Sequence, residues 1–313
     1  MGAQATYHPP VTGGPIDRRI LLAFAAVVLI AGSNIVAVRF SNRELDPFWG
    51  AGIRFLLGSS ILWGFVIPSR VRMPTGRALA GTVAYGALAF FVSYSFFYWG
   101  SQEVPAALGG TIMGAVPLLT VLLAAAQRLE PLRLRGVIGA VVAFGGIALM
   151  SSGELSGEVS VASVTAIGVA ATAASESGIV LEWLPHAHPV TTNAIAMSVG
   201  AVLLLALSLL AGETWSWPVS TSVWIAVIYL GVASPFLFML LVYVVRRWSA
   251  TGASYQFVLF PLVAVIGGAL LLGEPLTSSL LLGAPVVLAG VYVGALSGRG
   301  NRATSAAATA ADL

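Results

Sequence analysis

The stretch PLLTVLLAAAQRLEPLRLRGVIGAVVAFGG at residues 117–146 returns as PLVAVIGGALLLGEPLTSSLLLGAPVVLAG at residues 261–290. Eleven of the thirty positions are identical without a gap, including a Glu-Pro pair and two glycines in each copy. A repeat of this length indicates two copies of one structural unit. Weaker matches extend it, so we predict two repeats, residues 18–152 and 159–297. The polar tails at 1–17 and 298–313 are expected to be disordered.

The composition places both repeats in a membrane. Apolar residues make up 58% of the 313 positions and charged residues only 9%, whereas a soluble domain has about 25% charged residues. Apolar runs reach about twenty residues, the length of a membrane-spanning helix. The period-2 alternation of a membrane barrel strand is missing. The sequence therefore predicts an all-α integral membrane protein.

Ten helices of about 20 residues fit between the short polar breaks. Five fall in each repeat, so the two repeats have the same number of spans. The predicted helices cover 20–38, 47–67, 78–99, 105–127, 134–151, 161–182, 190–211, 221–245, 251–272 and 277–297.

The distribution of arginine predicts the orientation in the membrane. With the N-terminus inside the cell, inner segments hold twelve of the fifteen basic residues and outer segments hold two. Basic residues concentrate on the cytoplasmic side of membrane proteins, so both termini are predicted to be cytoplasmic. Because five is odd, the second repeat must enter the membrane from the opposite side. We therefore predict two inverted five-helix repeats, an arrangement typical of secondary transporters.

Several motifs add a family resemblance over about residues 18–297. They are Gly32-Ser33-Asn34 in the first predicted helix, Arg54-Phe55 in the second, and the repeated Glu-Pro and Gly pattern that closes each half. With ten predicted spans, the chain resembles the EamA-type permeases of the drug/metabolite transporter superfamily. Ala31 stands where many relatives have Trp. The resemblance implies an exporter of small metabolites, amino acids or drugs in the inner (plasma) membrane of the cell, with proton coupling as an open option.

Three polar residues inside predicted helices are candidates for a substrate or proton pathway. Ionisable groups at membrane depth are expensive and usually functional. Glu176 is the strongest candidate for a proton relay, and Asn34 is its counterpart in the first repeat. Arg54 could bind an anionic group of the cargo, or pair with Glu103 or Glu176. The structural alternatives are a hydrogen-bonded Glu176, an Arg54 that ties helices together, and an Asn34 that joins two helices.

Further candidates lie on the third, fourth and ninth predicted helices. The third helix is rich in aromatic residues, of which Tyr94 lies deep enough to line a cavity, while Tyr98 is expected at the membrane interface. Tyr255 and Gln256 are polar positions near the inner end and could form part of a gate. Pro117 and Pro261 occupy matching places in the two repeats and are predicted to form paired hinges.

Other function classes find little support in the sequence. It contains no cysteine, no nucleotide-binding loop and no hydrolase motif. We expect no metal, no cofactor, no catalytic site and no nucleic-acid partner. The expected partners are a small-molecule solute and the lipid bilayer, with protons as an option and a monomer or homodimer as the assembly. The alternatives left open are a membrane-embedded enzyme, a non-transporting membrane protein, an importer and a nucleotide-sugar carrier.

Overall fold

A computed structural model of the chain describes residues 18–128, 134–154, 159–183, 187–247 and 256–293. Every regular element within these ranges is a helix. In chain order they are α1 (Arg18–Ser41), α2 (Pro47–Ser69), α3 (Gly76–Gly86), η1 (Ala87–Val92), α4 (Ser93–Gly100), α5 (Ala106–Met113), α6 (Val116–Ala126), α7 (Leu134–Glu154), α8 (Val161–Trp183), α9 (Pro189–Leu210), α10 (Thr221–Arg247), α12 (Gln256–Gly267), η2 (Gly268–Leu272) and α13 (Ser278–Val291).

The helices have the length and hydropathy of membrane spans. Seven helical stretches of 21 to 25 residues in the described chain are long and apolar enough to cross a bilayer, counting α3–η1–α4 and α5–α6 as single stretches. Three shorter apolar helices lie at 134–150, 259–272 and 278–290. Many large apolar side chains on these helices face outward, as expected where lipid is the solvent. The chain is therefore a multi-pass helical membrane protein.

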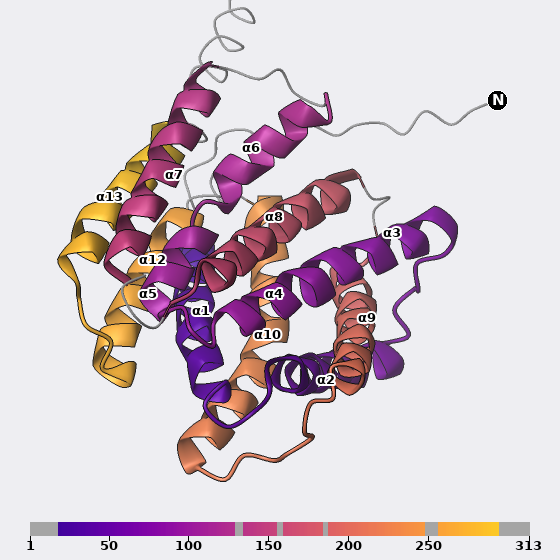
Figure 1. Ribbon diagram of the computed structural model, residues 1–313. Helices are drawn as coiled ribbons and strands as arrows, with labels where there is room; N and C mark the ends of the chain where they lie inside the picture. Colours follow the sequence, from indigo (N-terminus) through magenta and orange to yellow (C-terminus); the bar gives the residue numbers. More distant parts are fainter. Residues whose placement is uncertain (1–17, 129–133, 155–158, 184–186, 248–255, 294–313) are drawn as a thin grey trace, which may run out of the picture.

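The repeated glycines meet one another between α7 and α13, which lie side by side (Figure 1). A Cβ added to Gly290 would come within 2.7 Å of the Gly139 carbonyl oxygen, and one added to Gly283 within 2.8 Å of the Gly146 carbonyl oxygen. No side chain fits at these distances, so the glycines allow the two backbones to touch. Their recurrence in the sequence thus has a packing explanation.

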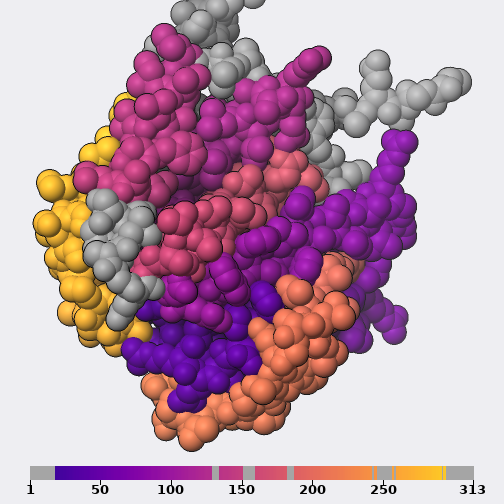
Figure 2. All heavy atoms as spheres, in the orientation of Figure 1, coloured from indigo at the N-terminus to yellow at the C-terminus, as the bar shows by residue number. Residues whose placement is uncertain are grey.

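Helix contacts keep the same pattern when the two halves of the chain are exchanged. α2 packs on α9, α5 on α12 and α7 on α13, so each helix meets its own counterpart. The contacts of α1 with α10 and α12 are matched by those of α8 with α4 and α6. In the space-filling view the yellow α13 covers the flank of α7, so segments from both halves form one surface (Figure 2).

Four connections gather at one end of the bundle and carry the carboxylates Glu44, Asp46, Glu103, Glu213 and Glu274. We call this end the acidic end. Glu44 and Asp46 bond to the α9–α10 linker. Glu103 bonds to Ser160, just before α8. Glu274, between η2 and α13, accepts from the first residue of α5.

The two predicted hinge prolines have different local structures. The helix is interrupted at Gly114 and Ala115, and Pro117 lies in the first turn of α6, where its missing N–H is not needed. Pro261 instead lies inside the continuous helix α12. The two matching prolines therefore stand at different positions in their helices, and their role as hinges stays a prediction.

Candidate functional site

Arg54 is the central polar group of the bundle interior. Its side chain is only 1% exposed, on a helix that otherwise carries apolar and small residues. Nε donates to Ser234 Oγ of α10 at 2.8 Å, which joins the two halves of the chain. Neither Nη1 nor Nη2 has a hydrogen-bond partner in the part of the chain that the structure describes. The guanidinium is therefore held at one nitrogen and free at the other two.

Aromatic rings surround this guanidinium. Its central carbon lies 4.8 Å from the centre of the Tyr94 ring and 5.1 Å from that of Phe55. Phe55 and Tyr94 pack edge to face at 4.7 Å, and Phe90 lies 5.1 Å from Phe55. Ring faces attract cations and partly replace the lost hydration of Arg54. Tyr94 therefore belongs to the ring cluster around Arg54, and its predicted role in lining a cavity stays a prediction.

The π-helix η1 interrupts the third span immediately before Tyr94. Such segments insert an extra residue into a helix and turn the residues that follow. Phe90 lies within η1 and Tyr94 just after it, and their rings stack with centres 6.4 Å apart. The local sequence thereby directs both rings to the side of Arg54.

Further buried polar atoms near this site lack partners. Both amide atoms of Asn34 are buried and without a hydrogen bond in the described ranges. Asn42, directly after α1, donates from Nδ2 to the Tyr98 carbonyl oxygen at 2.8 Å and so joins the end of α1 to α4.

Tyr98 corrects one expectation of the sequence analysis. It is fully buried rather than placed at the membrane interface. Its hydroxyl interacts electrostatically with the Arg54 guanidinium but completes no hydrogen bond of good geometry with any described residue. Tyr98 follows Tyr94 by four residues, so both lie on the same face of α4. That spacing was the signal for its burial, whereas Trp99, one residue on, is 40% exposed.

Three other contributors were not predicted as site residues. Ser234 holds Arg54 from the opposite half of the chain. Ser33 Oγ and the Tyr229 hydroxyl share a hydrogen bond of 2.5 Å between α1 and α10. Tyr229 also interacts electrostatically with Arg54. A hydroxyl on an apolar helix is common, so only the fold shows which ones converge.

Glu176 lies away from Arg54. It is half-buried on α8, and its Oε2 accepts a 2.6 Å hydrogen bond from Gln127 Nε2, directly after α6. Glu103 bonds to Ser160 and Ser163 at the acidic end. No carboxylate in the described ranges forms an ion pair with Arg54, so the structure supports neither predicted partner.

Of the predicted gate residues, Gln256 is the first residue of α12 and is buried. Tyr255 lies outside the described residues. The structure therefore gives the position of Gln256 only, and the gate formed with Tyr255 stays a prediction.

Glu274 ties three connections together at the acidic end. Both of its oxygens accept from the Ala106 backbone N–H at 3.0 Å, at the N-terminus of α5. Oε1 lies 3.4 Å from Arg39 Nε. Arg39 Nη1 donates in turn to the carbonyl oxygens of Ser101 and Gln102 at 2.8 Å each. Both carboxylate oxygens of Glu274 therefore have a partner.

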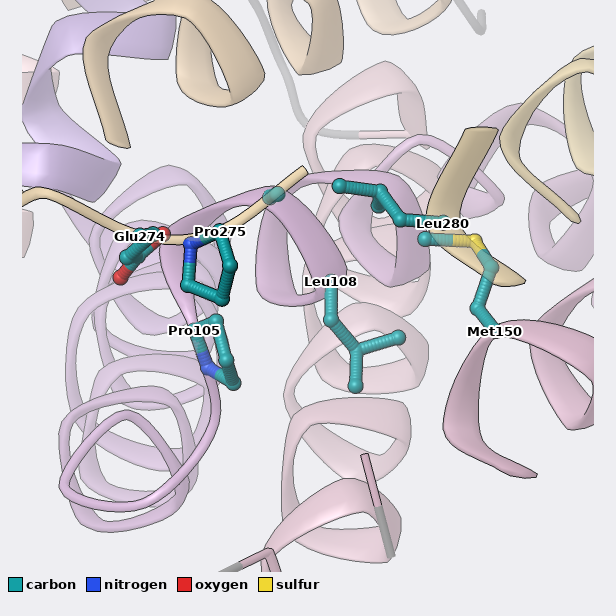
Figure 3. Close-up of a pocket in the computed structure, with 7 residues that line it drawn as sticks. Pro105, Leu108, Met150, Glu274, Pro275 and Leu280 are labelled. Atoms are coloured by element: carbon teal, nitrogen blue, oxygen red, sulfur yellow. The ribbon is translucent and has the colours of Figure 1, made fainter. Parts of the chain in front are cut away.

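A small cavity lies beside Glu274, between α5, α7 and the start of α13. Figure 3 shows Pro275 and Pro105 next to the carboxylate, with Leu108, Met150 and Leu280 on the far side. Its volume of about 20 Å³ has room for roughly one water molecule. A space this small and apolar is a packing gap and does not fit an organic solute.

The α9–α10 linker is bound to the first helical hairpin by three carboxylates. Glu213 accepts from the backbone N–H groups of Phe48 and Trp49 at 3.0 and 2.8 Å, at the start of α2. Asp46 accepts from Thr214, and Glu44 accepts from the backbone at Val219 and Ser220. A negative group is favourable at a helix N-terminus. These contacts close the acidic end across the two halves.

The fold and the enclosed polar cluster together define a class, which is a polytopic membrane protein with a charged site between two related halves. Comparison with known sequences specifies the class further. The chain matches the EamA-like transporter family over residues 18–152 and 161–295. These ranges include most of the chain, so the protein belongs to the EamA-like transporter family and is a membrane transporter.

Individual relatives agree with this family. An uncharacterized transporter of Archaeoglobus fulgidus is 24% identical over 274 residues, covering 87% of this chain and 97% of the relative. The uncharacterized inner membrane transporter YedA of Escherichia coli is 29% identical over 258 residues, covering 82% and 83%. A Salmonella typhimurium protein named as a probable amino-acid metabolite efflux pump is 25% identical over 290 residues, covering 88% and 94%. These names are those of transporters rather than enzymes.

A solved crystal structure has the same fold. Its TM-score against this chain is 0.62, with 18% sequence identity, and the match covers 88% of this chain and 96% of the other. At that identity the likeness concerns the arrangement of helices and carries no information on cargo.

Proposed function

We propose that this protein is a secondary active transporter that exports small organic metabolites, amino acids or drugs by alternating access. The observation that carries the proposal is the buried cluster around Arg54, with unpaired donors between two related halves. Polar groups without partners are costly inside a membrane protein and persist where they serve a function. A pocket between repeats is where secondary transporters bind cargo.

We further propose the architecture of ten spans in two inverted repeats, residues 18–152 and 159–297. The exchange symmetry of the helix contacts supports it. The acidic end supports it as well. Ser160, in the connection before α8, lies at this end beside Glu103. Helix α13 begins at the same end and runs away from it, toward the opposite end of the bundle. The chain's lack of cysteine allows a clean test. Single cysteines at Ser156 and Ser305 should label from opposite sides of intact cells, with Ser156 outside. Labelling from one common side would contradict the inverted repeats.

The contacts at the acidic end support one conformation of an alternating-access cycle. Three carboxylates join the two halves there. At the opposite end α6 packs on α8 and α7, and its last residues become exposed. We infer a conformation sealed on the outer side that accepts cargo from the cytoplasm, in the inner membrane. Proteoliposome assays with a solute panel, with and without a proton gradient, test this function. Absence of any protein-dependent flux would contradict it.

Glu176 remains the proposed proton relay, now with a defined partner. Its bond to Gln127 couples α8 to the end of α6, so protonation would release one end of α6. Glu176→Gln should fold normally and lose transport driven by a pH gradient, while exchange without a gradient persists. Glu213→Gln is the matched control at the acidic end. Full pH-driven transport by Glu176→Gln would remove the relay role.

Pro117 and Pro261 remain proposed hinges, and Gln256 and Tyr255 a proposed gate. Since Pro117 starts α6 directly after the interruption at Gly114, movement of α6 would pivot there. Pro117→Ala is expected to slow transport more than Pro261→Ala, measured as initial uptake rates. Equal rates in both variants and the parent would argue against a hinge at either position.

A further inference from the structure

We propose that the cargo carries one carboxylate group, and that Arg54 binds it through its two free Nη atoms. This inference rests on the proposed transport function and names the class of solute for the same site. It is carried by the geometry of a single side chain. Arg54 is bonded to Ser234, lies over the Phe55 and Tyr94 rings, and has unused donors.

The charge balance of the interior calls for an anion. The Arg54 side chain is buried among aromatic rings, and no described carboxylate pairs with it. A buried cation without a counter-charge is unfavourable, and a bound anion removes this penalty. A carboxylate brings one negative charge, which one guanidinium balances. A phosphate ester dianion would bring two, so the site selects a carboxylate over a phosphate.

The directions of the free groups fit a carboxylate. A guanidinium fork and a carboxylate form two parallel hydrogen bonds when neither partner is otherwise occupied. The bond from Nε to Ser234 Oγ already holds one edge of the guanidinium, so the remaining edge is the one formed by Nη1 and Nη2. The Tyr98 hydroxyl beside the guanidinium supplies one more donor.

The surroundings of Arg54 also select the rest of the cargo. Phe55, Phe90 and Tyr94 line this region with ring faces and edges. Such walls favour an apolar or flat body attached to the carboxylate. A cationic group on the cargo near Arg54 would add a second positive charge with no described carboxylate to receive it. Amines without a carboxylate are therefore expected to be poor cargo.

The test uses the full chain purified into proteoliposomes and matched sets of solutes. Each set contains an acid, its neutral amide and the related amine on the same carbon skeleton, such as 3-phenylpropionate, 3-phenylpropionamide and phenethylamine, with phenylalanine added. Branched aliphatic and linear skeletons form two further sets. In at least one set the acid should be transported at least about tenfold faster than the amide, as expected for loss of a bidentate charged contact.

Substitutions then assign the preference to Arg54. Arg54→Gln should abolish the acid-to-amide preference, and Arg54→Lys should retain part of it because it keeps the charge but loses the fork. Arg43→Gln is the control, since Arg43 also lies over a phenylalanine ring, at 4.4 Å, but on the exposed surface. Thermal unfolding of each variant shows whether it folds. If Arg54→Gln does not fold, Arg54→Lys and Tyr98→Phe carry the test through the same preference ratio.

The outcomes separate this inference from the transport function. Transport of amides or amines as fast as the acids, in every set, overturns the carboxylate assignment and leaves the transporter intact. An acid preference that survives in Arg54→Gln overturns the role of Arg54. In a further outcome, Arg54→Gln transports every solute more slowly, has a lower melting temperature and keeps the same acid-to-amide preference. This outcome would show that Arg54 is structural and would overturn the inference. If no solute of any set moves, both the inference and the proposed function fail.

Discussion

The acidic end and the interior around Arg54 both contain charged groups, but these groups differ in whether they have hydrogen-bond partners. At the acidic end Glu274 bonds to a backbone N–H and lies beside an arginine, and Glu213 bonds to two backbone N–H groups. In the interior, Arg54 has two unused nitrogens and Asn34 has no partner for either amide atom. The carboxylates of the acidic end thus have partners, whereas two guanidinium nitrogens and both amide atoms of the interior have none among the described residues.

This difference separates a structural role from a functional one. Charges that are fully paired add stability and have no capacity left for a ligand. Buried donors that stay unpaired reduce stability and are available to a cargo that brings the missing acceptor. Substitutions at the acidic end should therefore mainly change stability, and substitutions in the interior should mainly change transport.

The largest stability effect is expected for Glu274→Ala. The change leaves Arg39 without its counter-charge and Ala106 N–H without an acceptor, in a region where the Glu274 side chain is only 11% exposed. Breaking such a pair should cost about 3 kcal/mol. Thermal unfolding in detergent would show a clear drop in melting temperature. Arg39→Ala combined with Glu274→Ala should lose less than the two single changes summed, because they share one interaction.

Glu213→Ala should have a smaller effect. It removes a carboxylate that caps α2 and anchors the α9–α10 linker. Helix capping groups contribute about 1–2 kcal/mol, and Asp46 and Glu44 continue to hold the linker. The melting temperature should fall by less than in Glu274→Ala. Transport by the folded variant should stay close to that of the parent. A strong loss of transport at a temperature where the variant is folded would contradict a purely structural role for the acidic end.

Asn34→Leu tests the interior from the opposite direction. Leucine has the same number and branching of side-chain heavy atoms as asparagine, and it replaces the two buried polar atoms that have no described partner. Stability should stay the same or rise by about 1 kcal/mol, because an unsatisfied amide no longer has to be buried. Transport should fall if Asn34 contacts the cargo or lines its path. A large loss of stability would show instead that the amide has a structural partner.

Much of the fold could be predicted from the sequence because the bilayer simplifies the problem. Each span must form its own backbone hydrogen bonds, so an apolar run of sufficient length is already a helix. The predicted starts at residues 47, 134, 161 and 221 coincide with the first residues of α2, α7, α8 and α10. The π-helical segments and the interruption at Gly114 were not predicted, since they depend on packing against neighbouring helices.

The site was less predictable than the fold. Arg54 and Asn34 could be singled out because polar residues are rare in apolar helices. Ser234 and Tyr98 could not, because their importance arises from contact with Arg54 across 180 and 44 residues of sequence, respectively. The proposed link between Arg54 and Glu176 failed for the same reason. Periodicity gives the face of a helix but not which other helix that face meets.

The smallest expected effect is the pH dependence of stability at the acidic end. Hydrogen bonds from Ser160 and Ser163 lower the pKa of the Glu103 carboxyl below its ordinary value of 4.5. A carboxyl with a lowered pKa in the folded state stabilises the protein fully above its unfolded pKa and loses this contribution as the pH falls through the folded pKa. Melting temperature should therefore decline below pH 4.5, and less steeply in Glu103→Gln than in the parent. Since Glu103 is largely exposed, solvent screens the interaction and the difference should be slight. If the melting temperature declined equally steeply in both proteins, the decline would belong to the other carboxylates of the acidic end. Glu44 would then be the next residue to substitute, because hydrogen bonds with Ser220 and the Val219 backbone also lower its pKa.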